Sequence, residues 1–326
     1  MTKEKLEITK GFGTTCRVIV IGGCNIDLQG ISSQGIKLQD SNPGKLLTSA
    51  GGVGRNIASN IARLGLSTCL LTALARDEDG EYLRLSTLED GVDMTDILYS
   101  KDYPTSVYLS VLDEKGELVV AINQMDILSQ LNTDYLKEKK DRIDGSSLIV
   151  IDANLEEEAI EYLCKNHGNK LIFADPVSAI KSRKLKNFLQ YFYAIKPNLL
   201  EMETLVGRKL RDMRDYKKAI GELLELGVKQ VYLTLGKEGV LVADSKRIIH
   251  ATGEVSHLQS VTGAGDAFLA AAVYSTFKGW DIERLAGFSQ AMALISLESK
   301  NNTSFTKEEK IVKRRKAVKT QSLAEV

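Results

Sequence analysis

The chain has 326 residues, of which 43% are hydrophobic and 26% are charged. This length and composition suit one large α/β domain with an appendage, and they exclude a disordered or fibrous chain. Lysine plus arginine equals aspartate plus glutamate at 43 each, so no net charge attracts polyanions and nucleic acid is not an expected partner.

Residues 1–16 are predicted to be a flexible N-terminal extension, and they lack the apolar segment of a secretory signal. No apolar run approaches the length that spans a bilayer, so we expect no membrane association and a cytoplasmic address. The cysteines have neither metal-ligand nor redox spacing and are predicted to be buried free thiols in a reducing compartment. They are Cys16, Cys24, Cys69 and Cys164.

Short apolar segments alternate with amphipathic stretches along most of the chain, which predicts a doubly wound, mostly parallel α/β sheet flanked by helices. The predicted strands are 17–21, 68–73, 148–151, 171–174, 194–196 and 230–235. Helices are predicted at 56–64 and 267–277.

Two segments, at about 28–47 and 104–126, interrupt this alternation. Strands at 107–112 and 118–122 are joined by a turn and predict a β-hairpin. Together the segments predict a small β-sheet lid over a site at the carboxyl ends of the core strands. The core domain is predicted at 17–305, and 306–326 is expected to be a charged, solvated tail.

The first polar motif follows the first predicted strand. Asn25 and Asp27 are two apart on an extended segment, so they face the same side and can bind adjacent sugar hydroxyls. The glycines before them lack the third spaced glycine of a dinucleotide-binding turn. An ordinary polar turn is the alternative.

A second motif is rich in glycine and begins the first predicted helix. Gly51 and Gly52 allow a ligand to approach the backbone, and Asn56 can reach a hydroxyl from the first helical turn. A flexible loop is the alternative.

Two further motifs follow later strands, at the edge where open α/β sheets bind ligands. Asn198 and Glu201 would share a helical face and suit contacts to phosphate or magnesium-bound water. Thr234, Gly236 and Gly239 form the other motif. A helix cap is the alternative for either.

The last motif is Gly263, Ala264, Gly265 and Asp266, directly before an apolar helix. Free backbone N–H groups at a helix N-terminus favour an anion such as phosphate. A carboxylate there would repel phosphate, but it makes sense as a base that accepts a proton from an attacking hydroxyl. The alternative is that Asp266 only caps the helix.

These motifs and their order, from Arg17 to about Asn302, resemble the ribokinase (PfkB) family of carbohydrate and nucleoside kinases. The resemblance implies ATP-dependent phosphoryl transfer, with Gly263, Ala264 and Gly265 as the anion hole and Asp266 as the general base. It implies that the substrate hydroxyls are bound by Asn25, Asp27, Gly51, Gly52 and Asn56. For ATP it implicates Asn198, Thr234, Gly236, Gly239, Gly263, Gly265 and Gln290, with Glu201 holding Mg²⁺ through water.

Within the family, local features are most similar to the pseudouridine-kinase branch, which implies phosphorylation of the pseudouridine 5′-hydroxyl. These features are residues 40–45, 51–56, 119–125, 175–178 and 289–290 and the ending 301–302. The candidates for base recognition are Ser106, Asn123 and Lys181. A kinase for ribose, adenosine or uridine, a catalytically silent nucleoside-binding regulator and a dehydrogenase are the alternatives.

The resemblance also bears on a cation and a partner. Ser260 stands where many members carry aspartate near a monovalent-cation site, which puts K⁺ activation in doubt. The family implies a homodimer formed through the lid strands.

Overall fold

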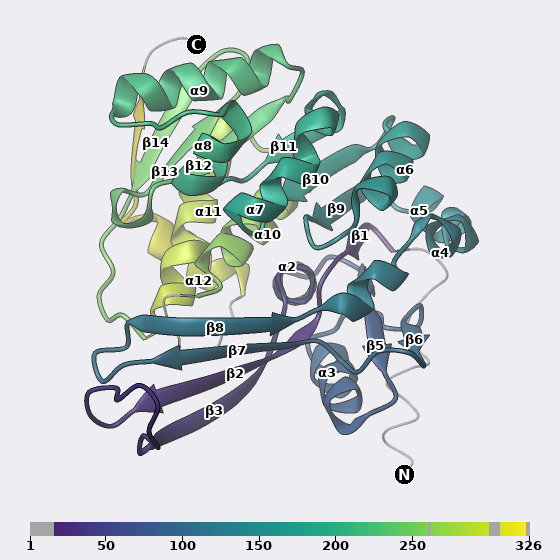
Figure 1. The fold of residues 1–326 in the computed structure, drawn as a ribbon. Coiled ribbons are helices and arrows are strands. Elements are labelled where there is room, and N and C mark those ends of the chain that lie inside the picture. Colours follow the sequence, from purple (N-terminus) through teal and green to yellow (C-terminus); the bar gives the residue numbers. More distant parts are fainter. Residues whose placement is uncertain (1–15, 260–261, 300–306, 324–326) are drawn as a thin grey trace.

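Nine strands form the main sheet of the computed structural model, which describes residues 16–259, 262–299 and 307–323. Their order is β15-β14-β13-β12-β11-β10-β9-β1-β4 (Figure 1). The parallel strands are β1 (Val18–Ile21), β4 (Thr68–Leu71), β9 (Leu148–Asp152), β10 (Leu171–Asp175), β11 (Phe192–Ile195) and β12 (Gln230–Thr234). The antiparallel strands are β13 (Val240–Ala243), β14 (Ile248–Thr252) and β15 (Lys319–Ser322). The predicted mostly parallel α/β sheet is therefore confirmed.

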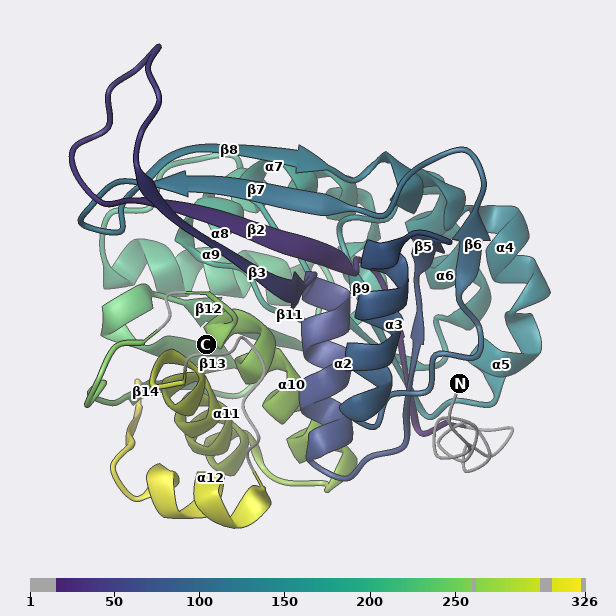
Figure 2. The same cartoon turned by 90° about the horizontal axis from the view of Figure 1, so that it is seen from below.

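Helices cover both faces of this sheet (Figures 1 and 2). One layer contains α2 (Val53–Arg63), α3 (Glu78–Glu89), α10 (Ala264–Phe277), α11 (Ile282–Leu297) and α12 (Glu308–Arg315). The other contains α4 (Thr133–Glu138), α5 (Lys140–Asp144), α6 (Glu157–His167), α7 (Ala179–Ser182), α8 (Leu199–Val206) and α9 (Met213–Glu225). The short 3₁₀ helices are η2 (Asp126–Gln130), η3 (Arg183–Tyr191) and η4 (Gly236–Glu238).

The continuous apolar runs of the core strands follow from this two-sided cover. In β1, Val18 and Val20 pack into the core beneath α2 and α10, whereas Ile19 and Ile21 pack into the opposite core. Because successive side chains of a strand point to opposite faces, a strand covered on both sides must be apolar throughout.

A four-stranded sheet in the order β3-β2-β7-β8 projects from the main body, and we call it the lid (Figure 1). Its strands are β2 (Asn25–Ser32), β3 (Gly44–Gly51), β7 (Val107–Leu112) and β8 (Leu118–Gln124), so the predicted hairpin is present. A separate small sheet pairs β5 (Ala73–Ala75) with β6 (Leu98–Ser100). The predicted strand 68–73 is thus divided between β4 and β5.

The prediction of a solvated C-terminal tail is wrong for residues 307–323. Ile311 on α12 is fully buried, Val318 is buried, and β15 extends the main sheet by pairing with β14. The segment is rich in charged residues, so the two buried apolar residues, Ile311 and Val318, were not recognised in the sequence. The predicted N-terminal extension, apart from Cys16, lies outside the described residues.

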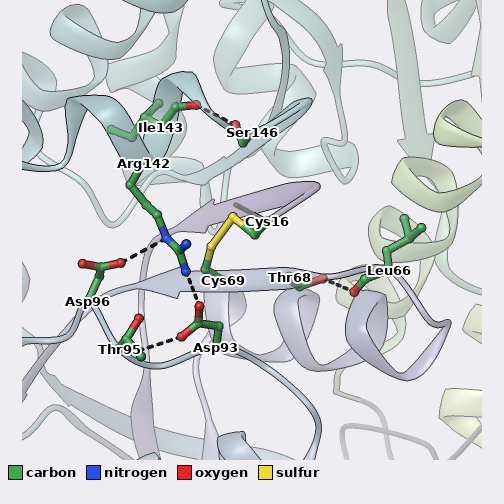
Figure 3. Close-up of a disulfide and its surroundings, with 10 residues drawn as sticks. All are labelled: Cys16, Leu66, Thr68, Cys69, Asp93, Thr95, Asp96, Arg142, Ile143 and Ser146. Carbon is green, nitrogen blue, oxygen red and sulfur yellow. Dashed lines mark hydrogen bonds and ion pairs between the residues drawn. A yellow bond between two sulfur atoms is a disulfide. The ribbon is translucent and has the colours of Figure 1, made fainter. Parts of the chain in front are cut away.

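The prediction of four free cysteines is also wrong, because Cys16 and Cys69 form a disulfide (Figure 3). Cys16 precedes β1 and Cys69 lies on β4, and these neighbouring strands bring together residues that are 53 positions apart in the sequence. The disulfide therefore lies at the end of the sheet where β1 begins. Cys24 and Cys164 are free and buried, and burial raises the pKa of each thiol to about 12.

Within the described residues, no helix combines the length and apolar character needed to cross a bilayer.

Candidate active site

The cradle at the N-terminus of α10 has the predicted form. Gly263 is the N-cap in the left-handed region, with φ 82°, and no side chain caps the helix. Among the described residues, no side chain is recorded as accepting from the first-turn N–H groups, which can therefore bind an anion. Asp266 lies inside the first turn, so the alternative that it caps the helix is wrong.

Asp266 is held by the helix that follows the glycine motif. Its Oδ2 accepts a hydrogen bond of 2.9 Å from Asn56 Nδ2. Burial, supported by the negative charge of Asp175, raises the pKa of Asp266 to about 7, against the opposing effects of Asn56 and Lys196. A carboxyl group that titrates near neutrality can accept a proton during turnover and release it afterwards.

Lys196 and Asp175 lie directly behind the cradle. The ammonium Nζ of Lys196 is 3.1 Å from Asp175 Oδ2, and both side chains are buried. Burial by itself would lower the pKa of Lys196, but the carboxylates of Asp175, Glu201 and Asp266 outweigh it and raise that pKa. Neither residue was predicted to belong to the site, although Lys196 ends the predicted strand 194–196 and directly follows β11 in the structure.

Asp152 connects the two glycine-containing segments, after β1 and at the start of α2, through hydrogen bonds. It is fully buried at the end of β9, and its Oδ2 accepts hydrogen bonds from the N–H groups of Gly23 at 2.8 Å and Gly54 at 2.9 Å. A Cβ atom at Gly22 would overlap the Asp152 carboxylate. The glycines after β1 therefore make room for a carboxylate, a role that the sequence pattern did not reveal.

Asn25 and Asp27 lie on the same face of β2, as predicted, with Asn25 Nδ2 donating to Asp27 Oδ1 at 2.7 Å. Burial raises the pKa of Asp27. A side chain at Gly51 would overlap the Asp27 carboxylate, and Gly52, with φ 99°, passes so close to Gly23 that a Cβ would lie 2.5 Å from its carbonyl oxygen. Gly51 ends β3 and Gly52 caps α2, so the flexible-loop alternative is wrong.

The polar face of β2 that contains Asp27 continues across the neighbouring lid strands β7 and β8. Asp27 pairs with Tyr108 on β7, and Tyr108 pairs with Asn123 on β8. Directly paired residues present their side chains on the same face of a sheet, so these three side chains form one row. Next to the row, Ser106 is fully buried, and its hydroxyl has no hydrogen-bond partner within the described residues. Tyr108 was not predicted as a site residue.

Asn123 and Lys181 line one cavity of about 300 Å³, together with Asn154. Lys181 Nζ donates to Asn154 Oδ1 at 2.6 Å, and burial lowers the pKa of Lys181. The amide nitrogen of Asn154 lies 2.8 Å from the position of a Cβ at Gly23, so the cavity adjoins the start of β2. The predicted base-recognition residues therefore lie next to the predicted sugar-binding residues.

Asn198 and Glu201 form a capping box at the start of α8, so the helix-cap alternative is correct for this motif. Glu201 Oε2 accepts from the Asn198 N–H at 2.8 Å, and Oε1 accepts from Asn198 Nδ2 at 2.9 Å. Since Glu201 is buried and both oxygens are engaged, it would reach Mg²⁺ through water. No cluster of three or more metal-binding side chains occurs within the described ranges.

The other nucleotide-site candidates lie at the end of β12, in the turn that follows it, or on α11. The backbone at Thr234 bridges to Asn198, and the Thr234 N–H donates to the Pro197 carbonyl at 2.9 Å. Gly236 and Gly239 both have positive φ, at 59° and 86°, and bound the turn after β12. Gln290 is buried on α11, and no hydrogen bond connects it with the other described candidates. Ser260 lies outside the described residues.

The comparisons with known proteins agree with this geometry. The model of the pfkB family carbohydrate kinases matches residues 16–309. The chain is 36% identical to the pseudouridine kinase of Escherichia coli K12, covering 86% of this chain and 90% of that protein. It is 32% identical to the uncharacterized sugar kinase YeiI of the same organism, covering 86% and 78%.

Two solved structures share the fold. A carbohydrate kinase from Agrobacterium tumefaciens superposes with a TM-score of 0.81 at 26% identity, covering 94% of this chain and 99% of that one. An Arabidopsis thaliana ribokinase complexed with ribose and ATP superposes with a TM-score of 0.78 at 19% identity, covering 93% and 99%.

Proposed function

Because the chain belongs to the pfkB family of carbohydrate kinases, which transfer phosphate to an alcohol group, we propose that it phosphorylates the 5′-hydroxyl of pseudouridine. The phosphate donor is ATP, and the products are pseudouridine 5′-phosphate and ADP. The observation that carries this proposal is the adjacency of three parts. They are the base Asp266 at the anion cradle, the polar pair Asn25 and Asp27, and the cavity that contains Lys181.

The proposed transfer uses Asp266 as the general base. Its carboxylate takes the proton of the attacking hydroxyl while the hydroxyl oxygen bonds to the γ-phosphorus, and the bond from that phosphorus to the bridging oxygen breaks as ADP leaves. The amides of the cradle, Gly263 to Gly265, stabilise the charge on the phosphoryl oxygens. Magnesium, when bound, would neutralise phosphate charge near Asn198 and Glu201.

Recognition of a nucleoside is proposed to divide between two neighbouring regions. The ribose hydroxyls would contact Asn25, Asp27 and Asn56 beside the close-packed glycines Gly51 and Gly52. The base would lie under the lid, against the row that continues from Asp27. Its polar edge would face Ser106, Asn123 and Lys181, and a cavity of about 300 Å³ has space for such a ring.

Sequence identity supports pseudouridine as the acceptor, since the chain is similar to the pseudouridine kinase of Escherichia coli over nearly the whole of both chains. The similarity to an uncharacterized sugar kinase keeps another nucleoside or sugar as the second candidate. Rates with ATP and pseudouridine, uridine, adenosine or ribose distinguish them. We expect kcat/KM for pseudouridine to exceed the others by about tenfold or more.

A higher kcat/KM for another acceptor would overturn the pseudouridine assignment and leave the kinase assignment intact. ATP turnover that no acceptor stimulates would instead support the nucleoside-binding regulator. Asp266→Asn serves as the background control for contaminating kinases in both cases.

We further propose that the outer face of the lid, opposite the row through Asp27, binds a second copy of the chain. Its exposed apolar side chains include Leu46, Val120 and Ile122, which are 74%, 51% and 61% exposed. Leu46 and Val120 belong to one cross-strand row, and Ile122 belongs to the adjacent row through Leu109. A contiguous apolar face of this kind is typical of a protein interface.

Sedimentation velocity tests this interface. The wild-type chain is expected to sediment as a dimer and the Ile122→Glu variant as a monomer, because a charge would be buried at the contact. Leu226→Glu, at a similarly exposed leucine near the end of α9, is the matched control. A wild-type monomer, or an Ile122→Glu dimer of unchanged affinity, would contradict the proposal.

A further inference from the structure

We infer that Lys196 is a phosphate-binding residue of this kinase, whose ammonium contacts the phosphoryl group in transfer, and that Asp175 positions this ammonium. The inference rests on the proposed function in that it takes Asp266 as the base and the α10 cradle as the anion site. It assigns a function to Lys196, for which no role was predicted from the sequence.

The first observation is the position of the Lys196 ammonium beside the first turn of α10. Lys196 follows β11 and is only 6% exposed, yet its Nζ lies 3.0 Å from the place of a Cβ at Gly265. Gly265 is in the first turn of α10. Glycine at this position thus leaves room for the ammonium, which lies against the same turn that presents free N–H groups.

The electrostatics point the same way. A buried cation beside a helix N-terminus is unfavourable, because the helix dipole already places positive charge there. The carboxylates of Asp175, Glu201 and Asp266 offset this positive charge, and the negatively charged phosphoryl group would offset it further.

Asp175 is itself fixed in place by its own turn. Its Oδ1 accepts a hydrogen bond of 2.9 Å from the Val177 N–H, and its Oδ2 faces Lys196. Val177 has φ 65°, which is unusual for a β-branched residue and costs backbone energy. The unfavourable backbone conformation of Val177 therefore accompanies the hydrogen bond that orients the Asp175 carboxylate toward the ammonium.

In the transfer step, Lys196 neither forms nor breaks a covalent bond. The hydroxyl proton passes to Asp266, the hydroxyl oxygen bonds to the γ-phosphorus, and the oxygen that bridged to the β-phosphorus leaves with ADP. Throughout, the ammonium remains protonated and offsets the charge on the transferring group.

The test is Lys196→Met, assayed with ATP and the acceptor that the wild-type chain turns over fastest. Loss of one charge-stabilising donor is expected to reduce kcat by about 100-fold or more. The groups that face Asp266 are Asn56, Asp152, Asp175 and Lys196. Since the positive charge of Lys196 favours the ionised base, the acidic limb of the kcat profile is expected to move to higher pH. An unmoved limb would overturn the inference.

A second variant separates catalysis from folding, because Lys196→Met leaves the buried Asp175 without its partner. The double variant Lys196→Met with Asp175→Asn removes both charges and is expected to recover thermal stability while kcat stays about 100-fold low. Recovery of kcat to within a few-fold of wild type would show that the pair is only structural and would overturn the inference.

Lys139→Met, which breaks an ion pair with Asp96 remote from the cradle, is the matched control and should keep wild-type kcat. Asp266→Asn is measured in parallel. Near-normal turnover in that variant would refute the base assignment, whereas the double variant reports on the Lys196–Asp175 pair.

Discussion

Asp266→Asn is expected to reduce kcat by about 10²–10⁴-fold while nucleoside binding stays within a few-fold of wild type. The amide can still accept a hydrogen bond from Asn56, so the first turn of α10 should keep its structure. The amide cannot accept the proton of the substrate hydroxyl, so the rate of the chemical step should fall while acceptor binding is kept. Steady-state kinetics and calorimetric titration of the acceptor measure the two quantities separately.

The pH dependence of the wild-type enzyme gives the same assignment a second readout. Burial raises the pKa of Asp266 to about 7, so below that pH the protonated carboxyl predominates and cannot act as a base. We expect kcat/KM to fall about tenfold per unit below pH 7 and to level off above it. Asp212→Asn, which alters an exposed cap of α9, should leave both kcat and this profile unchanged. Near-normal turnover of Asp266→Asn would refute the role.

The second large effect is on stability. Asp152→Ala is expected to lower the free energy of unfolding by about 3–9 kcal/mol, since three buried N–H groups lose their acceptor at about 1–3 kcal/mol each. These belong to Gly23, Gly54 and Asn154, at 2.8, 2.9 and 3.0 Å from the carboxylate oxygens. Urea denaturation monitored by circular dichroism measures the loss.

A matched control for this variant is Asp212→Ala. Asp212 also accepts backbone hydrogen bonds, from Arg214 and Asp215, but at an exposed helix end. Its loss is expected to cost about 1 kcal/mol. If Asp152→Ala cost no more than this control, the buried carboxylate would not be what holds β1, β9 and α2 together.

The sequence predicted those parts of the site that depend on local order. Polar residues directly after apolar runs, such as Asn25, Asn198 and Thr234, were expected at the carboxyl ends of strands, and the structure places them there. The glycines before α10 and the polar spacing on β2 are likewise local patterns.

The parts that were missed depend on which strands are neighbours. Asp152 meets Gly23 because β9 pairs with β1, and Lys196 meets Asp175 because β11 pairs with β10. Neither adjacency is encoded in a local motif. The edge strand β15, Lys319–Ser322, is polar and largely exposed, so it lacked the apolar run that identified the other strands.

The disulfide turns residues 16–69 into a covalent ring that includes β2, β3 and all of α2. The connection between the two lid strands, residues 33–43, is largely exposed, and such loop tips are where proteases cut. A single cut there would leave Asp27 on one piece and Asn56 on the other, still tied through Cys16 and Cys69. The nicked enzyme would migrate as one species until it is reduced, and both sides of the proposed sugar-binding surface would stay tethered.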